Sequence, residues 1–278
     1  MTMHRLAAAT WLALASQVAA AMEDPAQPLT PEIVLDAQAL HANYLARERS
    51  GGVLLNQDSG DLSGGALALT ATWAPVAWRL SARSLQGGIA YRGYTQLGLP
   101  LQTQTDLRWR HWHGWAGPSD RVQTTVGSFG IAAGAGQLVL RRAIRATARS
   151  LPVTETLRLG LVSAGGDWQL PLPGGGLLHG QLQWHHALVR RLAVDSGTVL
   201  DPYHLEPGRS GWASLGAGLQ WPLAAGVHLV ATLAHDALRV AAAPARVVYR
   251  QGQPAGISSY PGSRQRLQTI GIGLRVVL

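Results

Sequence analysis

The sequence predicts an all-β fold: an antiparallel up-and-down transmembrane β-barrel of about ten strands, with eight or twelve strands left open by boundary errors. Three observations predict it: a charge-poor composition, an export-type N-terminus, and regular alternation of apolar residues along the last segment. Charged residues make up 14% of the chain, against about 25% in ordinary soluble domains, whereas Gly reaches 33 residues and Trp 10. Short strands with apolar outer faces and aromatic belts are typical of this composition.

Residues 1–21 have the layout of a signal peptide, which leaves residues 22–278 as the barrel domain. A short basic start at residues 4–5 precedes an apolar run at residues 6–15, and small side chains at residues 18–21 suit cleavage. No other segment approaches the ~18 consecutive apolar residues that a spanning helix needs. The exported chain is therefore expected either to be soluble or to cross a membrane as strands.

The chain contains no cysteine, so disulfides, thiolate metal sites and cysteine nucleophiles are excluded. The formal net charge is +8, but the arginines are spread along the chain and no basic run of five residues occurs. Nucleic acid is therefore not an expected partner. Anionic lipid headgroups are a better match for exposed arginines.

The final segment shows the clearest strand pattern. Every second position is apolar and is expected to face lipid: Ile270, Ile272, Leu274, Val276 and Leu278. The alternate positions are expected to face the lumen, and among them Arg275 lies between small residues. Because the first strand of a barrel closes against the last, we expect Arg275 to reach toward Asp36.

The same period-2 test predicts ten strands in total, at residues 32–45, 65–74, 76–86, 103–115, 122–136, 154–170, 177–188, 212–223, 227–239 and 269–278. Short turns rich in Gly and Pro alternate with longer links, which are expected at residues 46–64, 87–102, 141–153, 189–211 and 240–264. Short periplasmic turns and long outer loops are typical of bacterial barrels.

On its closing strand the chain resembles the outer-membrane β-barrel proteins of Gram-negative bacteria. In that family the alternating C-terminal strand is the signal for the barrel-assembly machinery, and the matching residues here are Ile270, Ile272, Leu274, Val276 and Leu278. The family usually ends in Phe or Trp, whereas this chain ends in Leu278. The resemblance implies the cell outer membrane as location, with outer-membrane lipids and the assembly machinery as partners.

In size and strand number the chain is also similar to the omptins, ten-stranded surface proteases. Their catalysis requires an Asp-Asp pair and an Asp-His pair that face each other across the barrel mouth. Here His235 and Asp236 are adjacent in sequence, so on a strand they would point to opposite faces. We find no paired aspartates to complete the set, and the protease activity is not carried over.

The polar residues expected to face the lumen offer two interpretations. They are Asp36, Arg79, Arg83, Asp106, Arg108, Arg110, Arg158, His179, His185, His228, Asp236 and Arg275. They could form a cation-lined, porin-like passage for small solutes or anions. Alternatively, they neutralise one another in a packed interior, which we favour because a barrel of about ten strands is barely wider than its own side chains require.

Two further groups of residues could form a metal site or a hydrolase site. His111 and His113 share a face and could bind a metal together, but their phase places them with Leu107, Trp109 and Trp115 on the side expected to be apolar and lipid-facing. We expect no metal and no cofactor. Ser196, Asp201, His204 and Glu206 lie in one predicted outer loop and could act as a lipid or peptide hydrolase, although most such residues are solvated loop groups.

The favoured function is a non-enzymatic outer-membrane barrel with a structural or surface-interaction role, its surface ligand unidentified. A narrow pore and a hydrolase are the alternatives.

Overall fold

The computed structural model describes residues 31–94, 99–148 and 150–278. The predicted signal peptide, residues 1–21, lies outside these ranges. No helix within them is long and apolar enough to cross a membrane.

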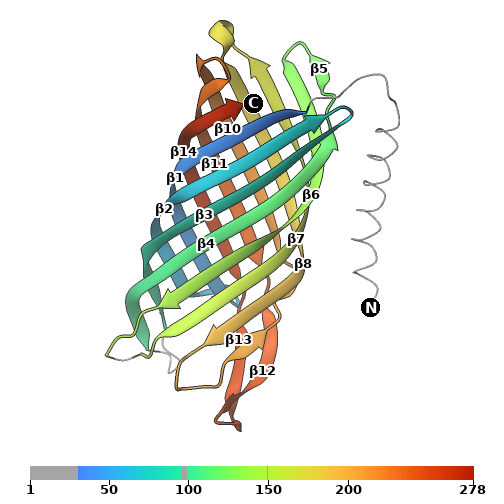
Figure 1. Ribbon diagram of the computed structural model, residues 1–278. Coiled ribbons are helices and arrows are strands. Elements are labelled where there is room, and N and C mark those ends of the chain that lie inside the picture. The colour runs from blue at the N-terminus through green and yellow to red at the C-terminus, as the bar shows by residue number, and fades with distance from the viewer. Residues whose placement is uncertain (1–30, 95–98, 149) are drawn as a thin grey trace.

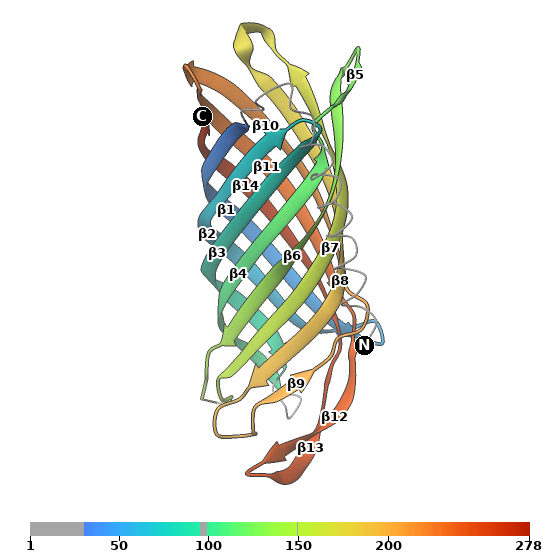
Figure 2. The same ribbon diagram turned by 45° about the vertical axis from the view of Figure 1, so that its right-hand side comes forward.

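Ten antiparallel strands form a closed ring, as Figures 1 and 2 show. In pairing order they are β1 (Glu32–Ser50), β2 (Val53–Trp73), β3 (Val76–Tyr94), β4 (Pro100–Pro118), β6 (Gly127–Ile144), β7 (Val153–Pro171), β8 (Leu177–Asp195), β10 (Gly211–Ala224), β11 (Val227–Val240) and β14 (Ser263–Val277). The β14–β1 and β8–β10 pairings complete the ring. The predicted fold class and number of strands are therefore confirmed.

Smaller elements distinguish the two ends of the barrel. One end, which we call the turn end, carries the C-terminus, β5 (Val122–Thr124) and the short 3₁₀ turn η1 (Pro173–Gly175). The opposite end carries β9 (Tyr203–Leu205) and a separate hairpin of β12 (Ala243–Arg250) and β13 (Gln253–Tyr260), which projects from the barrel in Figure 2. We call this hairpin the arm, and this end the arm end.

The strands are longer than the sequence pattern predicts, because several predicted links are paired β-structure. Strand β1 has 19 residues and β2 has 21, and a turn at Gly51 and Gly52 joins them where a link over 46–64 was expected. Both glycines have positive φ, 56° and 86°, which suits a tight hairpin. Crossing a bilayer takes about 9–11 residues of a tilted strand, so the strands extend well beyond it.

An apolar belt surrounds the turn-end part of the ring. Its outward side chains are 55–72% exposed in the isolated barrel: Leu67, Leu80, Trp112, Ile131, Leu182, Trp184, Leu215, Leu233, Ile270 and Ile272. Further along the strands toward the arm end, outward positions become polar, as at His41, Asp61, Arg110, Arg158, His235 and Gln268. The belt is the surface that fits the hydrocarbon region, and the strand parts beyond it lie outside that region.

The interior follows the opposite gradient. Toward the arm end it is filled by fully buried apolar side chains, among them Tyr44, Leu62, Leu85, Leu107, Leu138, Leu140, Leu159, Leu205, Leu238 and Leu267. Toward the turn end it is polar. The arm-end half of the barrel is therefore organised like a soluble protein, with an apolar core and a polar outer wall.

The position of the apolar belt can be tested with two substitutions on β14. Leu274→Arg places a charge on the lipid-facing wall and should destabilise the barrel by about 2–4 kcal/mol in phospholipid vesicles. Gln268→Arg adds the same charge to the same face beyond the belt and should be nearly neutral. Urea unfolding of the two variants measures the difference, and equal destabilisation would contradict the position of the belt.

Candidate functional site in the barrel interior

The first and last strands are joined inside the barrel by Asp36 and Arg275, which are cross-strand partners on β1 and β14. Nε and Nη2 of Arg275 donate to the two carboxylate oxygens of Asp36 at 2.6 and 2.9 Å. Nη1 of Arg275 donates to Gln220 on β10 at 2.6 Å, and Nη2 of Arg79 lies 3.8 Å from Asp36. The contact expected between Asp36 and Arg275 is present, as a bidentate pair in which Asp36 is almost fully buried.

A second interior pair lies deeper in the barrel. Nη1 of Arg83 donates to Asp236 at 2.8 Å, and the indole Nε1 of Trp212 donates to the other oxygen of Asp236 at 3.0 Å. The guanidinium of Arg83 also lies 5.7 Å from the centre of the Trp212 ring. The charge of Asp236 is thus compensated by a cation, and its second oxygen by a neutral donor.

Stacked rings cross the interior at this level. We call the following six side chains the aromatic septum: Trp109, His111, His113, Trp115, His185 and Trp212. The ring of His185 stacks on Trp212 with centroids 4.4 Å apart and planes 29° apart, and Trp109 meets Trp212 edge-on at 5.8 Å. The septum lies between the apolar arm-end core and the polar turn-end interior.

Ser163 on β7 links two histidines of the septum. Its hydroxyl lies 2.8 Å from Nε2 of His113 and 2.6 Å from Nδ1 of His185. One hydroxyl can donate to one ring and accept from the other, so the three groups form a neutral chain without a carboxylate. This arrangement fixes the orientations of both rings.

The histidine positions correct the sequence analysis. His111 and His113 were expected on the lipid-facing side together with Leu107, Trp109 and Trp115, but all five point into the barrel. In the described ranges no group of three or more His, Cys, Asp or Glu is arranged to hold a metal ion.

A cavity of about 620 Å³ occupies the turn-end half of the interior. Its walls combine polar and apolar groups, and the polar side chains include Gln38, Thr70, Arg79, His179, Gln181 and Arg275. Trp115 of the aromatic septum lies at its boundary. The polar interior is thus a vestibule on the turn-end side of the septum.

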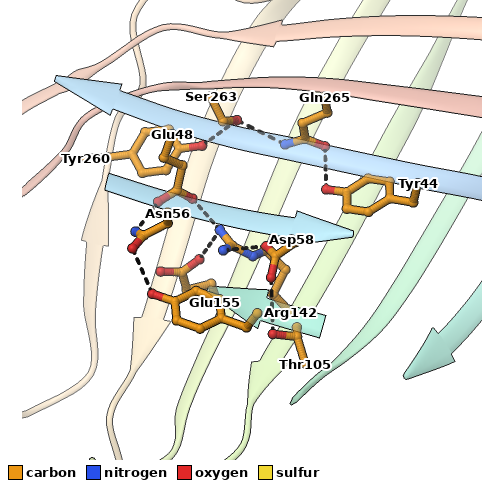
Figure 3. Close-up of polar contacts among 11 residues, drawn as sticks. Tyr44, Glu48, Asn56, Asp58, Thr105, Arg142, Glu155, Tyr260, Ser263 and Gln265 are labelled. Atoms are coloured by element: carbon orange, nitrogen blue, oxygen red, sulfur yellow. Dashed lines mark hydrogen bonds and ion pairs between the residues drawn. The ribbon is translucent and has the colours of Figure 1, made fainter. Parts of the chain in front are cut away.

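An ionic cluster lies in the interior near the arm end, and Figure 3 shows its polar contacts. Arg142 on β6 forms ion pairs with Glu48, Asp58 and Glu155, from β1, β2 and β7; the distances to Asp58 and Glu155 are 2.7 and 2.9 Å. The side chain of Arg142 is 7% exposed. Asn56 donates to Glu48 at 2.6 Å. One guanidinium therefore joins four strands across the interior.

Three carboxylates around one arginine leave an excess of negative charge. Burial raises the pKa of Glu155 to about 7, and the charges of Glu48 and Asp58 act in the same direction, while Arg142 opposes them. The outward neighbours of Glu155 on β7 are Thr154 and Thr156, so this group lies beyond the apolar belt. We infer that the cluster holds one proton in mildly acidic solution.

This cluster is not predicted from the sequence. Glu48, Asp58 and Arg142 fell within predicted links, and Glu155 was not selected. The signal that could have found Glu48 is the continued alternation of Tyr44, Ala46 and Glu48 on the inner face of β1. The pairing of Glu48 with Arg142, 94 residues away, has no local signal.

The structure separates the twelve predicted lumen residues into two groups. Eight belong to the inner face: Asp36, Arg79, Arg83, His179, His185, His228, Asp236 and Arg275. Four lie on the outer wall, and for them the prediction was wrong: Asp106, Arg108, Arg110 and Arg158.

The physical reason is that the polar residues of a strand lie on its inner face within the apolar belt and on its outer face beyond the belt. On β4, Trp112 faces outward within the apolar belt, whereas Arg110 and Arg108 face outward beyond it, where the surroundings are aqueous. Asp106 is exposed there and forms an ion pair with Arg145 at 2.7 Å. Assigning every charged residue to the lumen fails for the part of a strand that extends past the membrane.

The loop residues expected as a possible hydrolase site do not form a catalytic hydrogen-bonded arrangement in the described ranges. Asp201 accepts hydrogen bonds of 2.9 Å from the backbone N–H groups of Gln251 and Gly252, and thereby holds the turn of the arm. Ser196 is buried and His204 is exposed, and no hydrogen bond found in the described ranges joins them. The hydrogen bonds of Asp201 therefore have a structural role, which is to position the turn of the arm.

Comparison with known proteins bears on the fold. No family model matches the sequence, and no curated protein matches it. Among solved structures, the outer membrane protease OmpT from Escherichia coli superposes with a TM-score of 0.58 at 10% identity, covering 91% of this chain and 99% of that chain. This chain has the fold of the bacterial outer-membrane β-barrels.

Other outer-membrane barrels match less well. The translocator domain of the autotransporter NalP from Neisseria meningitidis has a TM-score of 0.43 at 13% identity, covering 97% of both chains. OprG from Pseudomonas aeruginosa has a TM-score of 0.40 at 8% identity, covering 90% of this chain and 97% of that one. At these identities the likeness concerns the outer-membrane barrel fold and no particular activity.

The ionic cluster makes a prediction about pH. Because the pKa of Glu155 is about 7 in the folded barrel and its ordinary value is 4.5, the folded state retains a proton in this interval that the unfolded chain loses. The free energy of unfolding should therefore fall as the pH rises from about 4.5 to 7, by up to about 3 kcal/mol.

Glu155→Gln should remove most of this fall, because the amide is neutral at every pH and can still accept from Arg142. Asp106→Asn, which removes an exposed carboxylate, should leave it unchanged. Urea unfolding in detergent at a series of pH values tests both variants. A parental profile that is flat, or that rises with pH, would refute the assignment to Glu155.

Proposed function

We propose that the protein is an integral outer-membrane barrel with a sealed interior, whose arm makes contacts at the cell surface. The observation that carries this proposal is the packing of the arm-end half of the interior. Buried apolar side chains, the aromatic septum and the Arg142 cluster follow one another along the axis, and the large cavity lies on the turn-end side of the septum. This arrangement opposes a narrow pore, because a solute would have to displace packed side chains.

The arm supports a role in surface contact. Its exposed apolar side chains include the cross-strand partners Val247 and Ile257, which are 52% and 76% exposed, and Tyr249, which is 45% exposed. Apolar side chains that gather on an aqueous surface are typical of interaction sites. They lie at the end of the barrel that projects past the apolar belt, and so are well placed to meet a partner outside the cell.

The arm is also held in a fixed position relative to the barrel. Tyr203 on β9 shares a 2.9 Å hydrogen bond with Ser258 on β13, and Arg246 donates to the backbone carbonyl of His204 at 3.2 Å. With the contacts of Asp201 described above, these bonds position both strands of the arm. A surface fixed in advance loses less conformational entropy on binding.

A hydrolase is less well supported. The close Ser–His contacts found in the described ranges are those of Ser163 with His113 and His185, and Ser163 is 8% exposed within the septum. Ser163 does not line the cavity of the vestibule, and in the described ranges no hydrogen bond to a carboxylate orients either histidine. Recognition of the closing strand by the barrel-assembly machinery stays a prediction.

An epitope-insertion experiment tests location and orientation together. A tag inserted between Gln251 and Gly252, in the turn of the arm, should bind antibody on intact cells. The matched tag between Gly174 and Gly175, in the η1 turn, should bind antibody after the outer membrane has been permeabilised. Exposure of both tags, of neither, or of the η1 tag alone on intact cells would contradict the proposed placement.

A further inference from the structure

Arginines face arginines across neighbouring strands on the outer wall. Arg239 on β11 is the cross-strand partner of Arg264 on β14, which is in turn the partner of Arg47 on β1. Arg47 pairs with Gln57 on β2, and Gln57 pairs with Arg92 on β3. We call the four arginines of this line the arginine row. All four are exposed and alternate with inward-facing residues, so they project from one continuous strip of the wall.

Two further pairs repeat the arrangement elsewhere on the wall. Arg108 on β4 is the cross-strand partner of Arg141 on β6, and Arg158 on β7 is the partner of Arg191 on β8. All four are exposed and face outward. Like charges placed directly opposite each other in a sheet are destabilising. Because this arrangement occurs repeatedly, we expect an anion to lie between the facing arginines.

Ion pairs with carboxylates of the described residues do not supply it; Asp106 acts electrostatically on Arg108 but is itself ion-paired with Arg145. In the described ranges, the arginines with ion pairs to Asp or Glu are Arg79, Arg83, Arg121, Arg142, Arg145 and Arg275. None of these belongs to the arginine row or to the two pairs. The side-chain hydrogen bond found within the row has a neutral acceptor: Nε of Arg47 donates to the amide oxygen of Gln57 at 3.2 Å.

The chemistry and position of these groups indicate the missing anion. The sequence contains 23 basic residues other than histidine, and every one of them is arginine. A guanidinium binds phosphate through two parallel hydrogen bonds, which an ammonium cannot do. On β14 the belt residue Ile270 is followed outward by Gln268, Arg266 and Arg264, so Arg264 lies about 20 Å along a tilted strand from the edge of the belt, on its headgroup side. Arg92 on β3 lies farther away, about 40 Å along its strand from the belt residue Leu80.

We propose that Arg239, Arg264 and Arg47 of the arginine row, together with the two arginine pairs, bind phosphate groups of the anionic lipids that surround the barrel in the outer leaflet. The phosphates lie between facing guanidinium groups and convert their repulsion into a bridging contact. This inference rests on the outer-membrane placement proposed above. It concerns the lipid around the barrel and not the partner of the arm.

Titration of the detergent-solubilised barrel with lipid A, followed by native mass spectrometry, tests the proposal. Lipid A that carries phosphates should bind more tightly than dephosphorylated lipid A. The double variant R47Q/R264Q should lose about ten-fold in affinity for the phosphorylated form. The control R209Q/R250Q removes the same charge from exposed positions off the barrel wall and should bind like the parent.

Three outcomes would overturn the proposal: equal binding of the two lipids, unchanged binding by R47Q/R264Q, or an equal loss in the control. A competition arm with inorganic phosphate separates the two sources of phosphate. If inorganic phosphate alone displaces lipid A at similar concentration, the site takes free phosphate, and the lipid assignment is wrong.

A second readout uses the repulsion itself. In neutral detergent without phosphate, Arg264→Gln should raise the temperature of unfolding, because it relieves repulsion from Arg239 and Arg47. With lipid A present the same variant should be less stable than the parent. Absence of this reversal would contradict the bridging contact. Both assays use purified protein in detergent, so failure of the cell-surface placement, which the epitope tags report, is distinguishable from failure of this inference.

Discussion

The closed ring of backbone hydrogen bonds is the constraint on which the rest of this structure depends. In the hydrocarbon region no water is present to pair with N–H and C=O groups, so a strand there needs a partner on both sides. The β14–β1 pairing meets this requirement over 15 residue pairs, from Val34 to Glu48 on β1. The ion pair of Asp36 with Arg275 adds a side-chain link at the same seam, inside the barrel.

Once the ring is closed, each strand has one inner and one outer face, and the surroundings decide which face is polar. Within the belt the outside is lipid and the interior is polar, as in the pair of Leu274 outward and Arg275 inward. Toward the arm end the outside is water and the interior is an apolar core, as in Arg108 outward and Trp109 inward. The period of two persists along the strand while the chemical pattern reverses.

This reversal explains what could be predicted from the sequence. The ten strands and the faces of the closing strand follow from alternation, which is local and independent of the surroundings. The faces of Asp106, Arg108, Arg110 and Arg158 required knowledge of where each strand leaves the membrane. Strand lengths were underestimated because segments rich in Gly, Asn and Asp, such as 56–65 of β2, resemble loops.

Glycine in such a segment has a packing role in this barrel. A Cβ on Gly64 would lie 1.9 Å from the backbone oxygen of Ser84 on β3, so the close approach of these strands needs glycine. The ionic cluster around Arg142 was beyond sequence reasoning for a different reason. Its four members come from four strands, and the ring alone brings them together.

The sealed interior that we propose has the aromatic septum and the ionic cluster in series between the vestibule and the arm end. Conductance across a planar bilayer tests this most directly, with protein whose folding is verified by its heat-dependent migration on gels. A sealed barrel should give no stable single-channel steps at either polarity. Reproducible steps of constant size would show an open path through the septum and would contradict it.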